Sequence, residues 1–191
     1  MYGQTTSGKT YTMLGTAEQP GVLPCALRDV FRHIEQAPFQ FRVWVSYLEI
    51  YNESIHDLLV SQGQGQGPGG EGAALKIRED PRMQGPDVAG LKRQQVWSFE
   101  QAVLLMNFGE EQRTYKATRI HEHSSRSHAI FRLYLEAAPL GEAPRFSCLN
   151  LVDLAGSERL TEPEGAAETQ HINKSLFVLS HVIKKLAEGK E

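Results

Sequence analysis

The first ten residues hold the feature that most restricts what this chain can fold into, a glycine-rich stretch that ends in a lysine and a threonine. Residues 3–10 read GQTTSGKT and fit the pattern G-x-x-x-x-G-K-[ST] at each constrained position. Glycines let the backbone curl until its N–H groups point inward at an anion, and the N-terminus of a following helix adds partial positive charge. The pattern therefore predicts a phosphate-binding loop that leads into a helix of an α/β fold.

The chemistry of such a loop assigns roles to its members. Lys9 would reach the β- and γ-phosphates of a nucleotide, and the hydroxyl of Thr10 would bind Mg²⁺. The predicted nucleotide-binding residues are Gly3, Gln4, Thr5, Thr6, Ser7, Gly8, Lys9, Thr10 and Tyr11. The alternative is a Gly/Thr/Ser turn that matches the pattern by chance, since only Met1 and Tyr2 stand where a buried strand should precede the loop.

A second stretch predicts a sensor for the terminal phosphate. Residues 149–153 (LNLVD) read as an apolar strand that ends in Asp153, which would hold Mg²⁺ through its water shell. The stretch continues as D-x-x-G, and the N–H of Gly156 could bind a γ-phosphate and move away when that phosphate leaves. A buried strand that ends at a polar turn is the alternative.

A third stretch, residues 123–128 (HSSRSH), is a polar loop before a predicted strand. The hydroxyls of Ser124 and Ser125 could reach Mg²⁺ and an attacking water, and Arg126 could pair with Glu158. A solvated Ser/Arg/His turn is the alternative here. The three histidines at 121, 123 and 128 have no carboxylate or cysteine to complete a zinc shell, so zinc is disfavoured.

Periodicity predicts alternating helices and strands, which favours an α/β fold with a mixed sheet flanked by helices. The expected helices begin near residue 9, at Pro24, at Ser98 with a capping box to Gln101, and over the final segment, whose apolar stripe runs from Ile172 to Leu186. The expected strands cover residues 41–51, 129–136 and 146–153, with shorter ones within 75–97, whereas residues 52–60 read as a turn and a short helix.

Composition excludes several classes of protein. A chain of 191 residues with 40% hydrophobic residues can bury a core, and its net charge of −3 gives no overall signal for nucleic acid. No apolar run reaches the length of a membrane span, and the two cysteines are interpreted as reduced, buried thiols of a cytosolic protein. The Gly/Gln-rich residues 61–73 predict a flexible loop within a single domain, residues 1–191.

Taken together, five stretches resemble the kinesin motor domain, in order and in spacing. They are residues 3–13 (GQTTSGKTYTM), 46–59 (SYLEIYNESIHDLL), 124–128 (SSRSH), 153–158 (DLAGSE) and 172–176 (INKSL). Within the family, residues 75–80, 129–133 and 175–179 are most similar to the centromere-associated kinesins. The resemblance implies a P-loop NTPase-like sheet, with SSRSH as switch I, DLAGSE as switch II and the final helix as the switch II helix.

The resemblance also implies an activity, ATP hydrolysis with Mg²⁺ coupled to movement along microtubules. On this basis Ser125 completes the Mg²⁺ shell, Ser124 positions the lytic water, Gly156 senses the γ-phosphate, and Arg126 pairs with Glu158. Basic residues of the final helix and of a second stretch are the expected microtubule contacts: Lys174, Lys184, Lys185, Arg78 and Arg82. We expect a cytoskeletal location, no membrane or nucleic acid partner, and a parent protein that dimerises through a coiled-coil stalk.

Some residues depart from the family pattern. The phosphate-binding loop begins at residue 3 and the final helix runs to the end of the sequence, so we expect the middle of a larger motor domain, truncated at both ends. His121 stands where the family usually has asparagine, and acidic Glu162 and Glu164 lie in a shortened loop. These departures leave open a non-motile nucleotide- or tubulin-binding module without turnover. A GTPase is disfavoured because no N-K-x-D motif follows, and a myosin-type motor fits the switch II sequence less well.

Overall fold

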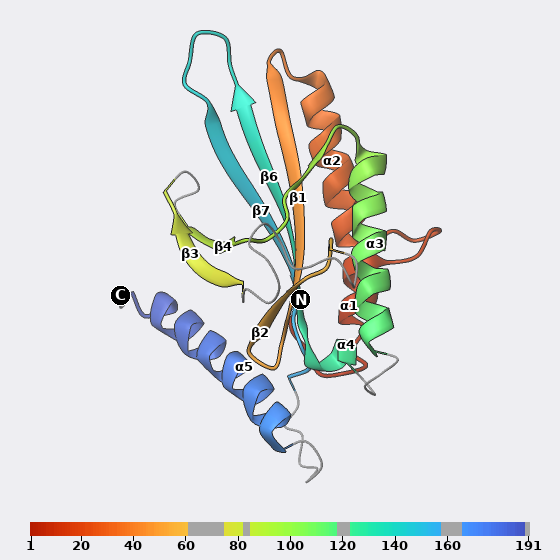
Figure 1. Cartoon of the computed structure of the whole chain (residues 1–191), viewed down its shortest axis with the longest axis vertical. Coiled ribbons are helices and arrows are strands. Elements are labelled where there is room, and N and C mark those ends of the chain that lie inside the picture. The colour runs from red at the N-terminus through yellow and green to blue at the C-terminus, as the bar shows by residue number, and fades with distance from the viewer. Residues whose placement is uncertain (61–74, 82–84, 118–122, 158–165, 190–191) are drawn as a thin grey trace.

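The computed structural model describes residues 1–60, 75–81, 85–117, 123–157 and 166–189. The Gly/Gln-rich loop predicted at residues 61–73 lies outside these ranges. Within them, helices lie on both sides of a central sheet (Figure 1). None of the described helices is long and apolar enough to cross a bilayer.

Three long antiparallel strands form the centre of the sheet. They are β1 (Gln40–Tyr51), β6 (His128–Ala138) and β7 (Arg145–Asp153), in the order β1-β6-β7. Two short strands, β2 (Ser54–Asp57) and β5 (Gln94–Val96), both pair with the other edge of β1. The long strands agree with the predicted ones to within two residues at each end, because their aromatic and β-branched side chains favour the pleated backbone.

Residues 52–60 differ from the prediction, and the short helix expected there is wrong. Asn52 and Glu53 both have positive φ, 50° and 61°. Two consecutive residues of this kind form the type of turn that joins adjacent antiparallel strands. The chain therefore folds back as the β1–β2 hairpin, with Tyr51 opposite Ser54.

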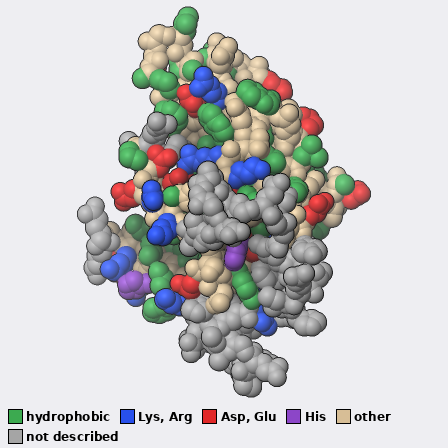
Figure 2. Space-filling view, in the orientation of Figure 1, with side chains coloured by type: hydrophobic (Ala, Val, Ile, Leu, Met, Phe, Trp, Pro, Cys, Tyr) green, Lys and Arg blue, Asp and Glu red, His purple; other side chains and the backbone are tan. Residues whose placement is uncertain are grey.

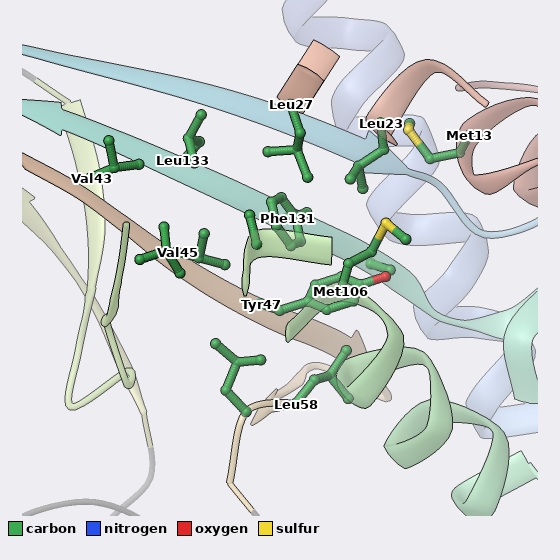
Figure 3. Packing of buried hydrophobic residues seen from close by; sticks show 14 of the residues in the cluster. Met13, Leu23, Leu27, Val43, Val45, Tyr47, Leu58, Met106, Phe131 and Leu133 are labelled. Atoms are coloured by element: carbon green, nitrogen blue, oxygen red, sulfur yellow. The ribbon is translucent and has the colours of Figure 1, made fainter. Parts of the chain in front are cut away.

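One face of the sheet is covered by helices α1 (Lys9–Leu14), α2 (Val22–Gln36) and α3 (Phe99–Ala117) (Figure 1). Odd-numbered residues of β1 and β6 point at these helices because side chains alternate along a strand. They form the main core with apolar residues of the helices, as Figure 3 shows. Its labelled members are Met13, Leu23, Leu27, Val43, Val45, Tyr47, Leu58, Met106, Phe131 and Leu133.

The opposite face carries a β-hairpin and the last helix. The hairpin joins β3 (Lys76–Asp80) to β4 (Gly85–Ala89), and α5 (Ala166–Ala187) lies beyond it (Figure 1). The predicted final helix is confirmed, and Leu176 of its apolar stripe is buried against Ala155. The C-terminal part of the stripe is exposed, with Val182, Ile183 and Leu186 at 46%, 57% and 71% exposure.

A parallel contact at the outer edge of β7 makes the sheet mixed. The amino group of Met1 donates to the carbonyl of Val152 at 2.6 Å, and Leu154 N–H donates to the carbonyl of Met1 at 3.2 Å. In a pair of parallel strands, one residue hydrogen-bonds to the carbonyl of a residue on the neighbouring strand and to the N–H two positions further along that strand. Met1 has this pattern with Val152 and Leu154. The residues before the phosphate-binding loop therefore run beside β7, which brings that loop next to Asp153.

Candidate functional site

The predicted phosphate-binding loop is a tight turn that leads directly into α1. Gly8 caps the helix with φ of 81°, a conformation that glycine adopts without a steric penalty. Thr6 also has positive φ, 66°, and Ser7 N–H donates to the carbonyl of Gln4 at 3.2 Å. A Cβ added to Gly3 would come within 2.7 Å of the Ser7 hydroxyl. Close approach of the backbone to itself gives the curled shape that the pattern predicts.

Lys9 lies over this loop. Its Nζ donates to the carbonyls of Gly3 and Gln4 at 2.9 and 2.8 Å, so the ammonium group is held at the mouth of the turn. Tyr11, also predicted to bind nucleotide, is exposed and donates its hydroxyl to Gln19 Oε1 at 2.9 Å. Lys9 therefore lies against the loop, Tyr11 lies further along α1, and their nucleotide-binding roles stay predictions.

Thr10 and Asp153, the predicted magnesium ligands, are in direct contact. Thr10 Oγ1 donates to Asp153 Oδ2 at 2.7 Å, although the two residues are far apart in sequence. Asp153 is 4% exposed, and its other oxygen, Oδ1, is buried and has no hydrogen-bond partner among the described residues. A hydroxyl and an orphaned carboxylate oxygen are hard ligands of the kind that Mg²⁺ takes, so these residues fit the ion.

The other two predicted loops converge on the same place. Gly156 N–H donates to the carbonyl of Ser125 at 2.7 Å, which joins the 153–157 segment to α4 (His123–Arg126). Ser157 N–H donates to the carbonyl of Gly3 at 3.0 Å, which joins the same segment to the phosphate-binding loop. Three stretches that were predicted separately from the sequence thus lie next to one another.

Two of the predicted switch residues lie partly or wholly outside the described residues. The side chain of Ser124 and the whole of Glu158 lie outside what the structure describes, as do His121, Glu162 and Glu164. The predicted ion pair between Arg126 and Glu158 therefore stays a prediction. Arg126 itself ends α4, directly after Ser125.

Arg113 of α3 is a member of the site that the sequence analysis missed. Its side chain is 3% exposed and lies 3.5 Å from Asp153 Oδ2 and 3.5 Å from Glu49 Oε1. It also donates to the carbonyl of Ser127 at 3.4 Å. A signal was present: Glu49 is an acid within the apolar strand of residues 41–51, and such a residue needs a buried cationic partner.

Further carboxylates shape the charge around this arginine. Glu110 lies one turn before Arg113 and receives a hydrogen bond from the Tyr47 hydroxyl. Burial raises the pKa of Glu110, and burial followed by the charge of Glu110 raises the pKa of Tyr47 well above its ordinary value. Burial alone would lower the pKa of Arg113, but Glu110 and the other acids outweigh it and raise that pKa. The arginine thus stays charged beside Asp153.

The predicted microtubule contacts lie mostly on the face that carries α5. Lys174, Lys184 and Lys185 are exposed on this helix, and Arg78 is exposed on β3. Arg82 lies outside the described residues. Lys174 Nζ is 3.5 Å from Glu53 Oε2, which reduces its free charge. Figure 2 shows Lys and Arg side chains over α5 and the neighbouring hairpin, with Asp and Glu side chains among them.

The loop and its place at the edge of a helix-flanked sheet put the chain in the P-loop class of α/β proteins. The comparison with known families is more specific. The chain belongs to the kinesin motor domain family, whose model matches residues 1–191.

Curated relatives agree with this membership. Kinesin-like protein KIN-7I of Oryza sativa subsp. japonica is 47% identical over 204 residues, with 100% of this chain and 16% of the rice protein covered. Centromere-associated protein E of Homo sapiens is 45% identical over 199 residues, with 98% of this chain and 7% of that protein covered. The predicted likeness to centromere-associated kinesins is therefore confirmed, beside a plant relative of slightly higher identity. The chain spans less than a third of either relative.

Solved structures confirm the predicted fold. A fast kinesin, studied for its ATPase mechanism and interactions with microtubules, superimposes with a TM-score of 0.82 and 34% identity, over 100% of this chain and 54% of that one. The KIF14 dimer on a microtubule with AMP-PNP superimposes with a TM-score of 0.79 and 39% identity, over 100% of this chain and 56% of that one. The helix-flanked sheet is that of the kinesin motor domain.

Proposed function

We propose that this chain binds ATP with Mg²⁺ between its three converging loops, hydrolyses it, and couples the hydrolysis to movement along microtubules. One observation carries the proposal: the hydrogen bond from Gly156 N–H to Ser125 joins switch I to switch II beside the contact between Thr10 and Asp153. A phosphate placed between these loops would meet both at once. Family membership and the AMP-PNP on the microtubule-bound KIF14 structure support the same assignment.

The residues divide the chemistry as their positions allow. Lys9 and the N–H groups of the Gly3–Thr10 loop bind the β- and γ-phosphates, with Tyr11 further along the helix. Thr10 and Ser125 would hold Mg²⁺ directly and Asp153 would hold it through water; when bound, the ion neutralises charge on the phosphates. Positioning and charge stabilisation account for most of the catalysis of such reactions.

The switch residues supply the response to the terminal phosphate. Gly156 N–H now donates to Ser125, and we propose that it turns to the γ-phosphate when ATP is bound. Ser124 would position the attacking water, and Arg126 with Glu158 would close the site as an ion pair. Loss of the γ-phosphate returns Gly156 to Ser125, which gives the site two discrete arrangements.

The microtubule is the partner that the exposed charges favour. Tubulin's surface is acidic, and residues 174–185 of α5 contain three lysines and no acid. Arg78 of β3 would contribute as well, together with Arg82. The proposal includes a cytoplasmic, cytoskeletal location and a parent protein that dimerises through a coiled-coil stalk outside this sequence.

Phosphate release with and without microtubules tests the proposed function. We expect the chain to release phosphate from Mg-ATP faster when microtubules are added, and Lys9→Ala to abolish release under both conditions. The matched control is Arg145→Ala, a change of an exposed cation at the opposite end of β7 from Asp153. Lys184→Ala with Lys185→Ala should reduce the stimulation and leave the basal rate unchanged.

The result also separates the proposed function from its alternative. ATP binding without phosphate release would identify a non-motile nucleotide-binding module. Release that is unchanged by Lys9→Ala would contradict the proposal, because the site would not be the source of the activity.

A further inference from the structure

His128, the first residue of β6, lies between switch II and α5 and contacts both. Ala155 N–H donates to its Nδ1 at 3.1 Å, and its Nε2 lies 2.9 Å from Ser175 Oγ. Ala155 directly precedes Gly156, the proposed γ-phosphate sensor, and Ser175 lies in the described part of α5. One ring therefore joins a peptide of the sensor loop to the helix on the outer face of the molecule.

The two contacts determine how the ring is protonated. A backbone N–H can only donate, so Nδ1 must accept and carries no proton. The neutral ring then has its proton on Nε2, which donates to the Ser175 hydroxyl. Burial lowers the pKa of His128, and the charge of Arg113 lowers it further, which favours the neutral ring. Each nitrogen thus has a fixed and different role.

This arrangement gives the sensor loop a polar connection to α5 through the N–H of Ala155, whose Cα also joins the peptide that carries the Gly156 N–H. When the Gly156 N–H turns from Ser125 to a phosphate, the backbone torsions at Ala155 change, and the movement can pass to the Ala155 N–H. Leu176 packs on Ala155 beside the ring, but apolar packing is not directional, whereas a hydrogen bond has a preferred geometry. The ring can therefore transmit the direction of the movement.

We propose that His128 is a positioning residue that couples switch II to α5, through Ala155 N–H on one nitrogen and Ser175 on the other. The coupling rests on the proposed nucleotide binding, because the phosphate supplies the change that it transmits. His128 does not touch the phosphates and takes no part in the bond that breaks. Its effect is on how α5 responds to the nucleotide.

Substitutions separate the two contacts. Ser175→Ala removes the contact to α5 and leaves the contact to Ala155. His128→Asn keeps an amide oxygen where Nδ1 stands and has no atom at the Nε2 position, so it should reproduce Ser175→Ala. The double variant should then lose nothing more, because both changes break the same bond. Ser180→Ala is the matched control, since it removes an exposed hydroxyl from the same helix.

Amide hydrogen exchange of the full chain measures the coupling, with Mg-AMP-PNP, with Mg-ADP and without nucleotide. Without nucleotide, we expect residues 174–187 to exchange about fivefold faster in Ser175→Ala than in Ser180→Ala, the effect of one lost hydrogen bond. In the wild type and in Ser180→Ala, exchange in 174–187 should differ between AMP-PNP and ADP. In Ser175→Ala and His128→Asn that difference should disappear, while residues 153–157 still respond.

The outcomes distinguish this inference from the proposed function. Fluorescent AMP-PNP titrated into the same samples reports binding, and failure of the wild type to bind would contradict the proposed function. In that case, the exchange rates of Ser175→Ala and Ser180→Ala without nucleotide would still test the contact between His128 and Ser175. Equal rates in the two variants would overturn that contact. Binding with an α5 response that survives both Ser175→Ala and His128→Asn would also overturn the coupling. A lower melting temperature without loss of the response would show a purely structural role and count against it.

Discussion

At the scale of single residues, Arg113 is the cation on which the buried acids of the site converge. Its guanidinium lies within 4.0 Å of Glu49, Glu110 and Asp153, and both Glu49 and Arg113 are almost completely removed from water. Removing two charges from water is costly, and their attraction repays this cost only when both are present. Arg113 therefore holds the Asp153 carboxylate in place beside Thr10.

Replacement of this arginine by an uncharged side chain of similar length should destabilise the fold strongly. We expect Arg113→Met to lower the free energy of unfolding by about 3–5 kcal/mol, because the buried carboxylates of Glu49 and Asp153 both lose the positive charge of Arg113. Urea unfolding followed by circular dichroism measures the change. Arg113→Lys keeps the charge and should cost less.

A double variant separates the charge from the packing. Glu49→Met added to Arg113→Met should recover part of the lost stability, because one of the buried carboxylates that lost the charge of Arg113 is then removed as well. A double variant that is less stable than Arg113→Met would show that the arginine acts through packing instead.

The sequence predicts a site residue when that residue belongs to a local motif, and does not predict it when its role depends on a distant partner. Lys9, Thr10, Asp153 and Gly156 stand at fixed spacings in local motifs, and the structure brings Thr10 to Asp153 as expected. Arg113 pairs with Asp153 across 40 positions, and no local spacing marks that pairing. The roles predicted for Ser124 and Glu158 stay predictions.

At the scale of elements, the packing of α3 on β1 depends on a glycine. A Cβ added to Gly109 would lie 2.2 Å from Cδ1 of Tyr47, whose ring is 3% exposed in the core. The ring also packs edge-on against Phe131, with centroids 5.3 Å apart, which limits its freedom to move. Gly109 therefore lets α3 approach the sheet closely enough for Glu110 and Arg113 to reach the site.

Gly109→Ala tests this close approach. Alanine in place of glycine inside a helix normally stabilises it by about 1 kcal/mol, but overpacking a core costs about 1–3 kcal/mol. Because the added methyl would overlap the ring, we expect a lower melting temperature. Glu111→Ala, at an exposed position of the same helix, is the control and should change little. A Gly109→Ala protein that melts higher than the wild type would refute the close approach.

The elements also show why a local pattern can mislead. The sequence predicts a turn and a short helix over residues 52–60, yet the left-handed turn at Asn52 and Glu53 returns residues 54–57 to β1 as a strand. The edge of β1 offers unpaired backbone groups, and pairing with them outweighs a weak helical preference. For α5, the apolar stripe predicts the helix correctly. The stripe does not predict which of its residues are buried, since its C-terminal part is exposed.

At the scale of the whole molecule, the pairing of strands in the sheet brings the loops of the candidate site together. Parallel contacts of Met1 with the end of β7 place the phosphate-binding loop beside switch II, and the β6–β7 pairing places switch I against both. The fold class could be predicted from the order of the motifs along the chain, because the motifs stand at strand ends that meet at one edge of the sheet. The sheet order itself follows from pairings between distant segments, which no local pattern in the sequence predicts.

The most direct test of the central claim, that these three loops form one site for a magnesium nucleotide, is the melting temperature with and without Mg-ATP. A ligand at a hundred times its dissociation constant stabilises the folded state by about 2.7 kcal/mol, or roughly 5–10 °C for a chain of this size. We predict such a rise for the wild type and for Lys76→Ala, an exposed control on β3, and none for Lys9→Ala or Asp153→Asn. Equal rises in the wild type and in Lys9→Ala, or no rise in the wild type, would contradict the claim.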